Sequence, residues 1–180
     1  MTSLVGATLL ITGIMASGKS TVAQGVAERL ERSVHLRGDL FRRMIVRGRC
    51  EMEPPLSDEA LHQLRLRYRM AAQAAGTYCA EGFAVIYQDI IIGALLNEAI
   101  SLHRAHPLYV VVLAPSPAVV LQRDRERHKQ TYQGWTPEML DAGLRQDTPR
   151  IGLWLDTSAQ TVTETVMAVL DQLESARVHP

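Results

Sequence analysis

The chain has 180 residues, 47% of them hydrophobic, and its 19 basic side chains balance 19 acidic ones. This length and composition predict one folded domain over residues 1–180, and the zero net charge disfavours a nucleic-acid partner. The sequence shows no membrane span, no secretory leader, and no metal or disulfide spacing around its two cysteines. We therefore expect a cytoplasmic protein without a membrane partner, present as a monomer or a homodimer.

Apolar stretches typical of strands alternate with amphipathic stretches typical of helices. Strands are predicted over residues 7–12, 33–36, 83–87, 108–113 and 151–155. Helices are predicted over residues 19–31, 40–46, 57–80, 117–127 and 162–173, with one more between the third and fourth strands and one that begins at Thr136 and Pro137. The alternation predicts an α/β fold, a single-domain, doubly wound, five-stranded parallel sheet with helices on both faces.

The segment after the first predicted strand matches the phosphate-binding pattern G-x-x-x-x-G-K-[ST] of a P-loop. It consists of Gly13, Ile14, Met15, Ala16, Ser17, Gly18, Lys19 and Ser20, and Thr21 follows it. Backbone N–H groups of such a loop surround nucleotide phosphates, and the N-terminus of the next helix adds its dipole. We expect Lys19 to bridge the β- and γ-phosphates of ATP and Ser20 to bind Mg²⁺, with Thr21 as a weaker helper. A glycine-rich turn without function is the alternative, and the complete pattern between a strand and a helix disfavours it.

Other features narrow the class of P-loop protein. The guanine-recognition pattern N-K-x-D is absent from the sequence. Motor and remodelling ATPases usually need a longer chain and an oligomer that supplies an arginine. A chain of this length is more typical of a kinase, in which a bound hydroxyl group attacks the γ-phosphate.

Asp39 and Arg42 follow the second predicted strand, and functional groups collect at the carboxyl ends of the strands in a doubly wound sheet. Their i, i+3 spacing places both side chains on one face of a short helix. A carboxylate there can accept or orient the proton of a substrate hydroxyl, and an arginine can clamp the substrate or the transferred phosphoryl group. The alternative is that Asp39 is only the N-cap of the helix and Arg42 is exposed.

Two further aspartates follow predicted strands. Asp89, after the third strand, is a candidate to hold Mg²⁺, to orient the substrate, or to serve the structure alone, and these three roles have equal weight. Asp156 follows the last strand, on the side expected to border adenine, where a structural role is favoured.

Arginines form two groups that bear on the site. Arg123 and Arg127 are i, i+4 neighbours at the end of a predicted helix, and they predict an arginine-bearing lid over residues 123–135 that closes on ATP. A solvated helix end is the alternative. Residues 47–80 form the expected substrate-side segment. Its arginines would suit an anionic acceptor, but exposed helix arginines explain them more simply.

These residues give the chain a resemblance to the small P-loop kinases, which include chloramphenicol phosphotransferase, gluconate kinase, shikimate kinase and polynucleotide 5′-kinase. The layout is similar over nearly the whole chain. Asp39 with Arg42 resembles the base-and-arginine pair of polynucleotide kinase, and Asp89 is similar to the aspartate that ends its third strand. Arg123 and Arg127 resemble the lid arginines of the group.

The chain departs from the shikimate kinases at two places. Gln88, Asp89 and Ile90 stand where those kinases have a triple-glycine turn, and Arg37 stands at the first position of their D-x-D motif. Our first hypothesis is therefore a kinase that uses ATP and Mg²⁺ to phosphorylate a hydroxyl group of a small molecule, a metabolite or an antibiotic. The alternatives are a nucleotide or polynucleotide 5′-hydroxyl kinase and, from another class, a non-catalytic ATP-binding switch.

Overall fold

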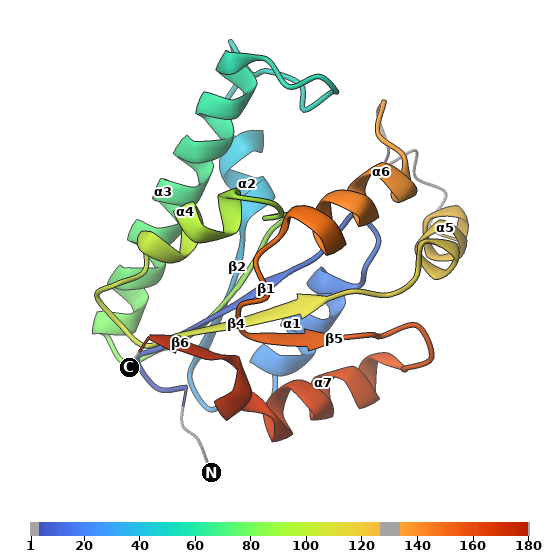
Figure 1. The fold of residues 1–180 in the computed structure, drawn as a ribbon. Coiled ribbons are helices and arrows are strands. Elements are labelled where there is room, and N and C mark those ends of the chain that lie inside the picture. Colours follow the sequence, from blue (N-terminus) through green and yellow to red (C-terminus); the bar gives the residue numbers. More distant parts are fainter. Residues whose placement is uncertain (1–3, 127–133, 180) are drawn as a thin grey trace.

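A mostly parallel sheet forms the centre of the protein. The computed structural model describes residues 4–126 and 134–179. The parallel strands are β1 (Thr8–Thr12), β2 (Ser33–Arg37), β3 (Ala84–Gln88), β4 (Leu108–Leu113) and β5 (Leu153–Leu155), arranged in the order β2-β3-β1-β4-β5 (Figure 1). The five parallel strands confirm the predicted fold class. A sixth strand, β6 (Arg177–His179), pairs antiparallel with β4 and was not predicted.

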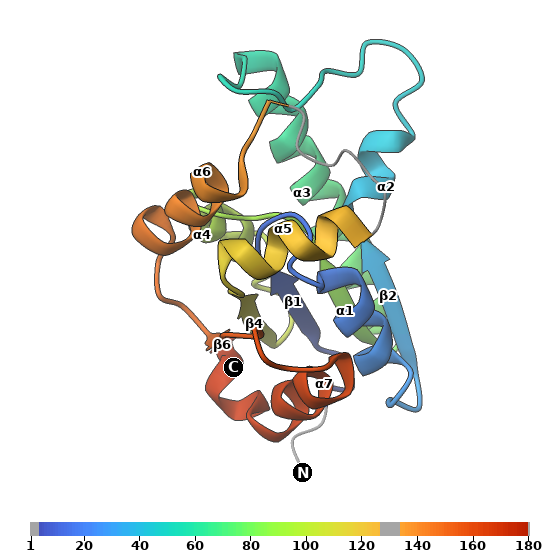
Figure 2. The same ribbon diagram turned by 90° about the vertical axis from the view of Figure 1, so that its right-hand side faces the viewer.

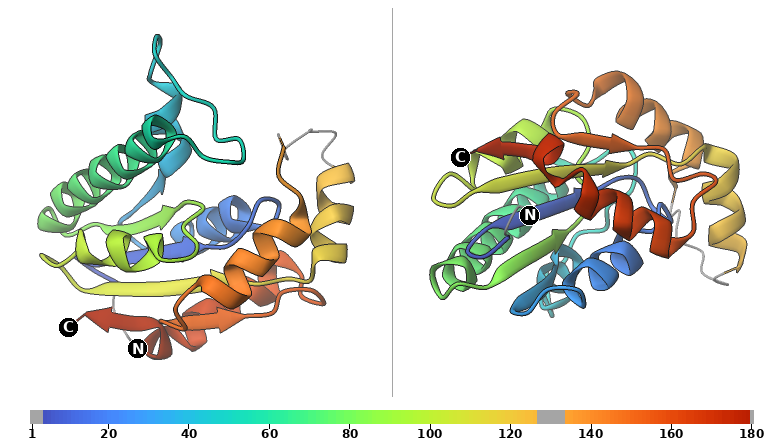
Figure 3. Two further views of the ribbon diagram at one scale, coloured as in Figure 1. Left: turned by 45° about the horizontal axis from the view of Figure 1, so that its top comes forward. Right: turned by 90° about the horizontal axis from the view of Figure 1, so that it is seen from below.

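Helices cover both faces of the sheet, as Figures 1 and 2 show. One face carries α1 (Lys19–Ala27) and α7 (Val162–Asp171), and the other carries α3 (Asp58–Ala80), α4 (Leu95–Ser101), α6 (Pro137–Ala142) and the π-helical turn η1 (Gly143–Asp147). Two more helices, α2 (Gly38–Arg43) and α5 (Pro117–Glu126), follow the carboxyl ends of β2 and β4. Figure 3 shows these strand ends flanked by α2 and α3 on one side and by α5 and α6 on the other.

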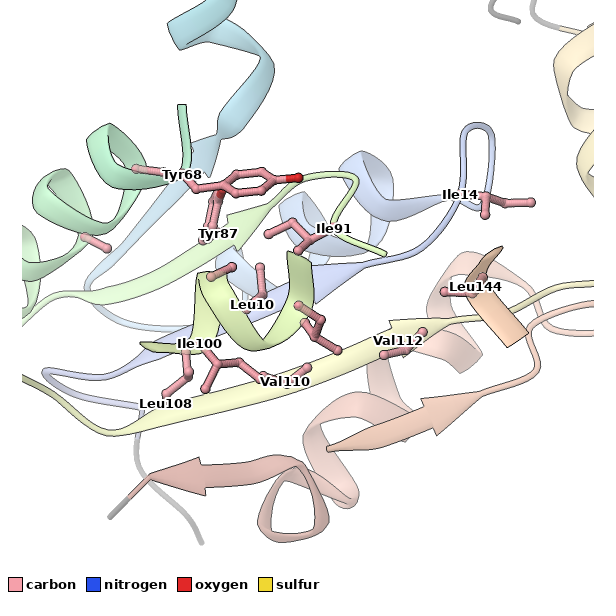
Figure 4. Packing of buried hydrophobic residues seen from close by; sticks show 14 of the residues in the cluster. Leu10, Ile14, Tyr68, Tyr87, Ile91, Ile100, Leu108, Val110, Val112 and Leu144 are labelled. Atoms are coloured by element: carbon pink, nitrogen blue, oxygen red, sulfur yellow. The ribbon is translucent and has the colours of Figure 1, made fainter. Parts of the chain in front are cut away.

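The strands supply a separate apolar core to each face. Leu9 and Ile11 of β1 pack in the cluster under α1 and α7, whereas Leu10 packs in the cluster under α3 and α4. Consecutive side chains of a strand point to opposite faces, so the continuous apolar run of β1 fills both cores. Figure 4 shows the second cluster, in which Tyr68 of α3 lies beside Tyr87 of β3.

Helix ends follow their local hydrogen bonds. Ser57 and Thr136 accept hydrogen bonds from the N–H groups of Ala60 and Met139, so both predicted N-caps are confirmed. The first helix is shorter than predicted, because its backbone changes to i→i+3 turns at the end: the N–H groups of Arg29 and Leu30 donate to the carbonyls of Val26 and Ala27. No helix of the described residues is long and apolar enough to cross a membrane.

Candidate active site

The loop between β1 and α1 has the backbone geometry of a phosphate cradle. Gly13 and Gly18 have φ values of 145° and 98°, and Ala16 has a φ of 58°. A Cβ atom on Gly13 would lie 2.4 Å from the carbonyl oxygen of Leu113, so only glycine fits where the loop passes the end of β4. The loop therefore keeps the compact turn that aims backbone N–H groups at an anion.

Lys19 lies along this loop. Its side chain is buried, and Nζ donates a hydrogen bond of 2.6 Å to the carbonyl oxygen of Ile14. Ser20 and Thr21 are exposed in the first turn of α1. The positive charge and the two hydroxyl groups thus sit at one helix N-terminus, as the sequence pattern predicts for a triphosphate site.

Asp39 lies in the first turn of α2, with its carboxylate 2.9 Å from the guanidinium of Arg43 and 3.8 Å from Nε of Arg37. The N-cap position belongs to Arg37, and no side chain caps this helix. The alternative that Asp39 is the N-cap is therefore wrong. Within the described residues, the Oδ1 atom of Asp39 is buried and has no hydrogen-bond partner.

Arg42 binds a different segment from Asp39. Its guanidinium pairs with Glu51 at 2.5 Å and donates a hydrogen bond of 3.2 Å to the carbonyl oxygen of Cys50. Both Asp39 and Arg42 line one cavity, as the predicted shared face requires. In this structure Arg42 holds the loop after α2 against the helix, so its direct contact with substrate stays a prediction.

Asp89 is fully enclosed by protein donors. One carboxylate oxygen lies 2.9 Å from Arg67 and accepts the Ile90 N–H at 2.8 Å, and the other accepts the Tyr87 hydroxyl at 3.2 Å. Burial raises the pKa of the Asp89 carboxyl, and the charge of Arg67 opposes that rise. Of the three roles predicted for Asp89, this set of partners favours the structural one over Mg²⁺ binding.

The carboxylate of Asp89 also supports the start of α2. A Cβ atom on Gly38 would lie 1.9 Å from its Oδ2 atom. Asp39 is the next residue along the chain, so the candidate base follows a glycine that lies directly against this buried carboxylate.

We expect Gly38→Ala to destabilise the protein by about 1–3 kcal/mol, because the new methyl group overlaps a buried, ion-paired carboxylate. Urea unfolding measures this loss. Gly76→Ala is the matched control, since a Cβ there meets only His106 at 4.0 Å in the middle of α3. Alanine favours a helix interior, so the control should gain up to about 1 kcal/mol. Equal stabilities of Gly38→Ala and wild type would contradict the contact.

Arg123 of α5 joins the P-loop to the segment after β5. Its guanidinium donates hydrogen bonds of 3.4 Å to the carbonyl oxygen of Ser17 and 2.9 Å to that of Thr157. The same elements enclose a cavity of about 320 Å³, here called the Arg123 cavity, lined by Ser17, Gly18, Thr21, Val22, Arg123, Glu126, Thr157, Gln160, Thr161, Val162 and Thr165. Arg127 and most of the predicted lid lie outside the described residues.

Replacing Arg123 with alanine should lower the kcat of phosphoryl transfer by about tenfold or more, with a smaller effect on ATP affinity, because a guanidinium stabilises the charge that develops on the phosphoryl group. Steady-state kinetics and ATP titration measure the two effects. Lysine lacks the planar fork of donors, so Arg123→Lys should not restore kcat. An unchanged kcat in Arg123→Ala would favour the solvated-helix alternative.

A second cavity, of about 310 Å³, lies beside the P-loop; we call it the Asp39 cavity. It is lined by Met15, Asp39, Arg42, Arg43, Met52, Leu56, Leu64, Arg67, Tyr68, Ile90, Ile92, Leu95, Trp135 and Leu140. Trp135 joins two of its walls, because the indole N–H donates a hydrogen bond of 2.6 Å to the carbonyl oxygen of Met52. The P-loop residue Met15 and Asp39 thus border one space.

Asp156 stabilises the turn after β5. Its carboxylate accepts hydrogen bonds from the N–H and hydroxyl groups of Ser158, and these bonds lower the pKa of the Asp156 carboxyl. Ser158 in turn accepts a hydrogen bond from the N–H of Ser116, after β4. These contacts agree with the structural role that the sequence favoured.

Residues 9–149 match the model of a family described as an AAA domain. The chain belongs to this AAA-domain family. No curated protein sequence matches it.

Solved structures with similar folds include two kinases and a tunicamycin resistance protein. The APS kinase of Mycobacterium tuberculosis, in complex with AMPPNP and APS, has a TM-score of 0.69 at 20% identity, over 94% of this chain and 98% of that one. A gluconokinase from Sinorhizobium meliloti has a TM-score of 0.65 at 20% identity, over 93% and 91% of the two chains. The tunicamycin resistance protein of Deinococcus radiodurans has a TM-score of 0.64 at 16% identity, over 96% and 98%. These similarities confirm the predicted α/β fold.

Sequence reasoning about this AAA-domain protein missed Arg67, the partner of Asp89. The signal was present: Arg67 lies three residues after Leu64 and four before Ala71, both buried on the inner face of α3. A charged residue on the apolar stripe of a helix indicates a buried ion pair. Trp135 was also missed, because its contact with Met52 joins segments 83 residues apart.

Proposed function

We propose that the protein transfers the γ-phosphoryl group of ATP to a hydroxyl group of a small molecule bound in the Asp39 cavity. One observation carries this proposal: Met15 of the P-loop and Asp39 line the same cavity. A phosphate held by the loop and a hydroxyl group held near Asp39 would therefore face one another. Positioning of this kind supplies much of the catalysis in phosphoryl transfer.

The site has a nucleotide side and an acceptor side. The loop amides and Lys19 would hold the β- and γ-phosphates, with Arg123 next to them across Ser17. On the acceptor side, the Asp39 side chain is 35% exposed and its Oδ1 atom has no hydrogen-bond partner within the described residues, and we assign to this carboxylate the acceptance of the hydroxyl proton. The substrate oxygen then forms its bond to the γ-phosphorus, the bond from that phosphorus to the β–γ bridging oxygen breaks, and ADP leaves with the electron pair.

Ser20 fits Mg²⁺, because this ion takes oxygen ligands and prefers to keep several waters beside the phosphates of a nucleotide. When bound, Mg²⁺ would neutralise charge on the β- and γ-phosphates. Asp89 is paired with Arg67, so the exposed hydroxyl groups of Ser20 and Thr21 are the donors that we assign to it.

The two other hypotheses predict different behaviour. A polynucleotide kinase would bind a strand of nucleic acid through basic groups, and binding would weaken with salt. A pure ATP-binding switch would not need the carboxylate of Asp39. The similar structures named above are an APS kinase, a gluconokinase and a tunicamycin resistance protein, so this fold does not by itself select one acceptor.

Measurement of ATP turnover with and without a library of small hydroxyl compounds tests the proposal. We expect a subset of acceptors to raise ADP release above the basal rate and to gain a phosphate in mass spectra. Stimulation by single-stranded oligonucleotides alone would instead favour the polynucleotide kinase. Tight ATP binding without transfer to any acceptor would favour the switch.

A further inference from the structure

The walls of the Asp39 cavity indicate the class of molecule that fits it. Ten of the 14 lining residues are apolar or aromatic, and the other four are Asp39, Arg42, Arg43 and Arg67. Among the described residues, no serine, threonine, asparagine, glutamine, histidine or lysine lines it. A sugar or sugar acid would bring several hydroxyl groups, which need matching donors and acceptors when they are removed from water.

The polar groups of the two large aromatic residues are already used by the protein. Tyr68 donates its hydroxyl hydrogen to the carbonyl oxygen of Ile90 at 2.9 Å, and Trp135 donates its N–H to that of Met52 at 2.6 Å. These two residues therefore contact a ligand through the surfaces of their rings. Met15 and Met52, whose flexible thioethers adapt to apolar ligands, complete this part of the wall.

The charges of the lining are neutralised in pairs. Each of its arginines has a carboxylate partner: Arg42 with Glu51, Arg43 with Asp39, and Arg67 with Asp89, at 2.5 to 2.9 Å. Two more arginines, Arg37 and Arg49, approach the acids Asp39 and Glu51 only at 3.8 Å and are over 40% exposed. An anionic acceptor would therefore compete with Glu51, Asp39 or Asp89 for these guanidinium groups.

A few polar atoms remain for orientation. Within the described residues, Oδ1 of Asp39 and the Nε atoms of Arg42 and Arg67 are buried without a hydrogen-bond partner. An apolar pocket with a few charged side chains, here those of Asp39, Arg42, Arg43 and Arg67, is typical of sites that bind one drug-sized molecule and orient it. The volume of about 310 Å³ is at the lower end for such sites.

We propose that the acceptor is an uncharged alcohol with a largely apolar, ring-bearing body, not a sugar acid, a free sugar or a nucleotide. Its body packs against Tyr68, Trp135 and the aliphatic wall, and its hydroxyl group lies at Asp39. The transfer step rests on the proposed function, but the selection of ligand class follows from the cavity alone.

Binding can be measured separately from phosphoryl transfer, because the chain has two tryptophans and only Trp135 lines the cavity. In a Trp154→Phe background, the fluorescence of Trp135 reports on its occupancy. The probes are cinnamyl alcohol and geraniol as neutral apolar alcohols, glucose as a neutral polyol, and gluconate as an anion. We expect saturable changes with cinnamyl alcohol, weaker ones with geraniol, and none with glucose or gluconate.

A pair of leucine variants tests whether the apolar wall is responsible. Leu95, at the start of α4, lines the cavity, whereas Leu102, just after the same helix, is 40% exposed and lies outside it. Leu95→Asn should weaken cinnamyl alcohol binding about tenfold or more and leave ATP affinity unchanged. Leu102→Asn should change neither.

The outcomes separate this inference from the proposed function. Saturable binding of cinnamyl alcohol without phosphorylation would support the ligand class and count against the kinase. Asp39-dependent phosphorylation of gluconate or glucose would support the kinase and overturn the ligand class. A fluorescence response to glucose or gluconate alone, or to none of the four probes, would also overturn it.

Discussion

Lys19→Ala should lower phosphoryl transfer by about 1000-fold or more and weaken ATP binding, while the fold stays intact. Lys19 is the one basic side chain of the P-loop, and its Nζ atom already lies over the loop, 2.6 Å from the carbonyl oxygen of Ile14. Removing a positive charge from the point where negative charge develops costs transition-state stabilisation directly. Single-turnover transfer rates and ATP titrations measure the two losses.

The same variant needs a test of folding, because the Lys19 side chain is buried. Its loss leaves one loop carbonyl without this donor, which should cost about 1 kcal/mol. Thermal unfolding should therefore shift by only a few degrees. Glu28→Ala, at the exposed end of the same helix, is the control and should keep wild-type transfer. Transfer by Lys19→Ala at the wild-type rate would mean that the nucleotide binds elsewhere.

The fold was predictable because its signals are local. Apolar runs of strand length, a glycine-rich turn after the first of them, and capping residues such as Ser57 and Thr136 each act within a few residues of the chain. The sixth strand could not be found in this way. Its pairing with β4 brings Arg177 beside Tyr109, and a strand of three residues carries no periodic pattern of its own.

The candidate site was predictable only where one segment contains the whole pattern. The P-loop is such a segment, and Asp39 could be placed at the end of β2 by the same logic. The ion-pair partners of the site aspartates could not be assigned from the sequence, because several arginines lie nearby in the chain and ion pairs depend on distances in the folded protein. In the structure Arg43, not Arg42, pairs with Asp39. Arg67 of α3 pairs with Asp89.

Charged partners lie beside Asp39. Its carboxylate is held between Arg43 at 2.9 Å and Arg37 at 3.8 Å. Gly38, the residue before it, lies directly against the buried carboxylate of Asp89, which places the buried ion pair of α3 next to the candidate base at α2.

Asp39→Asn should reduce phosphoryl transfer by about 10²–10⁴-fold and leave ATP affinity within a few-fold of wild type. Asparagine keeps the shape of the side chain but accepts a proton far less readily than a carboxylate does, and loss of a general base has an effect of this size. The loss will be at the lower end if the transition state is loose and the carboxylate mainly orients the hydroxyl group. Single-turnover transfer to a responsive acceptor, together with ATP titration, gives both numbers.

Two further variants separate the loss of the base from the loss of its ion pair. Arg43→Gln removes the same ion pair but keeps the carboxylate. The Arg43 side chain is 67% exposed, and an exposed ion pair contributes little to stability. Phosphoryl transfer should therefore fall much less in Arg43→Gln than in Asp39→Asn. Asp58→Asn makes the same change in the first turn of α3, at an exposed position outside the cavity, and should transfer at the wild-type rate. If Asp39→Asn transfers as fast as Asp58→Asn, Asp39 is not the base, and the assignment passes to Asp89.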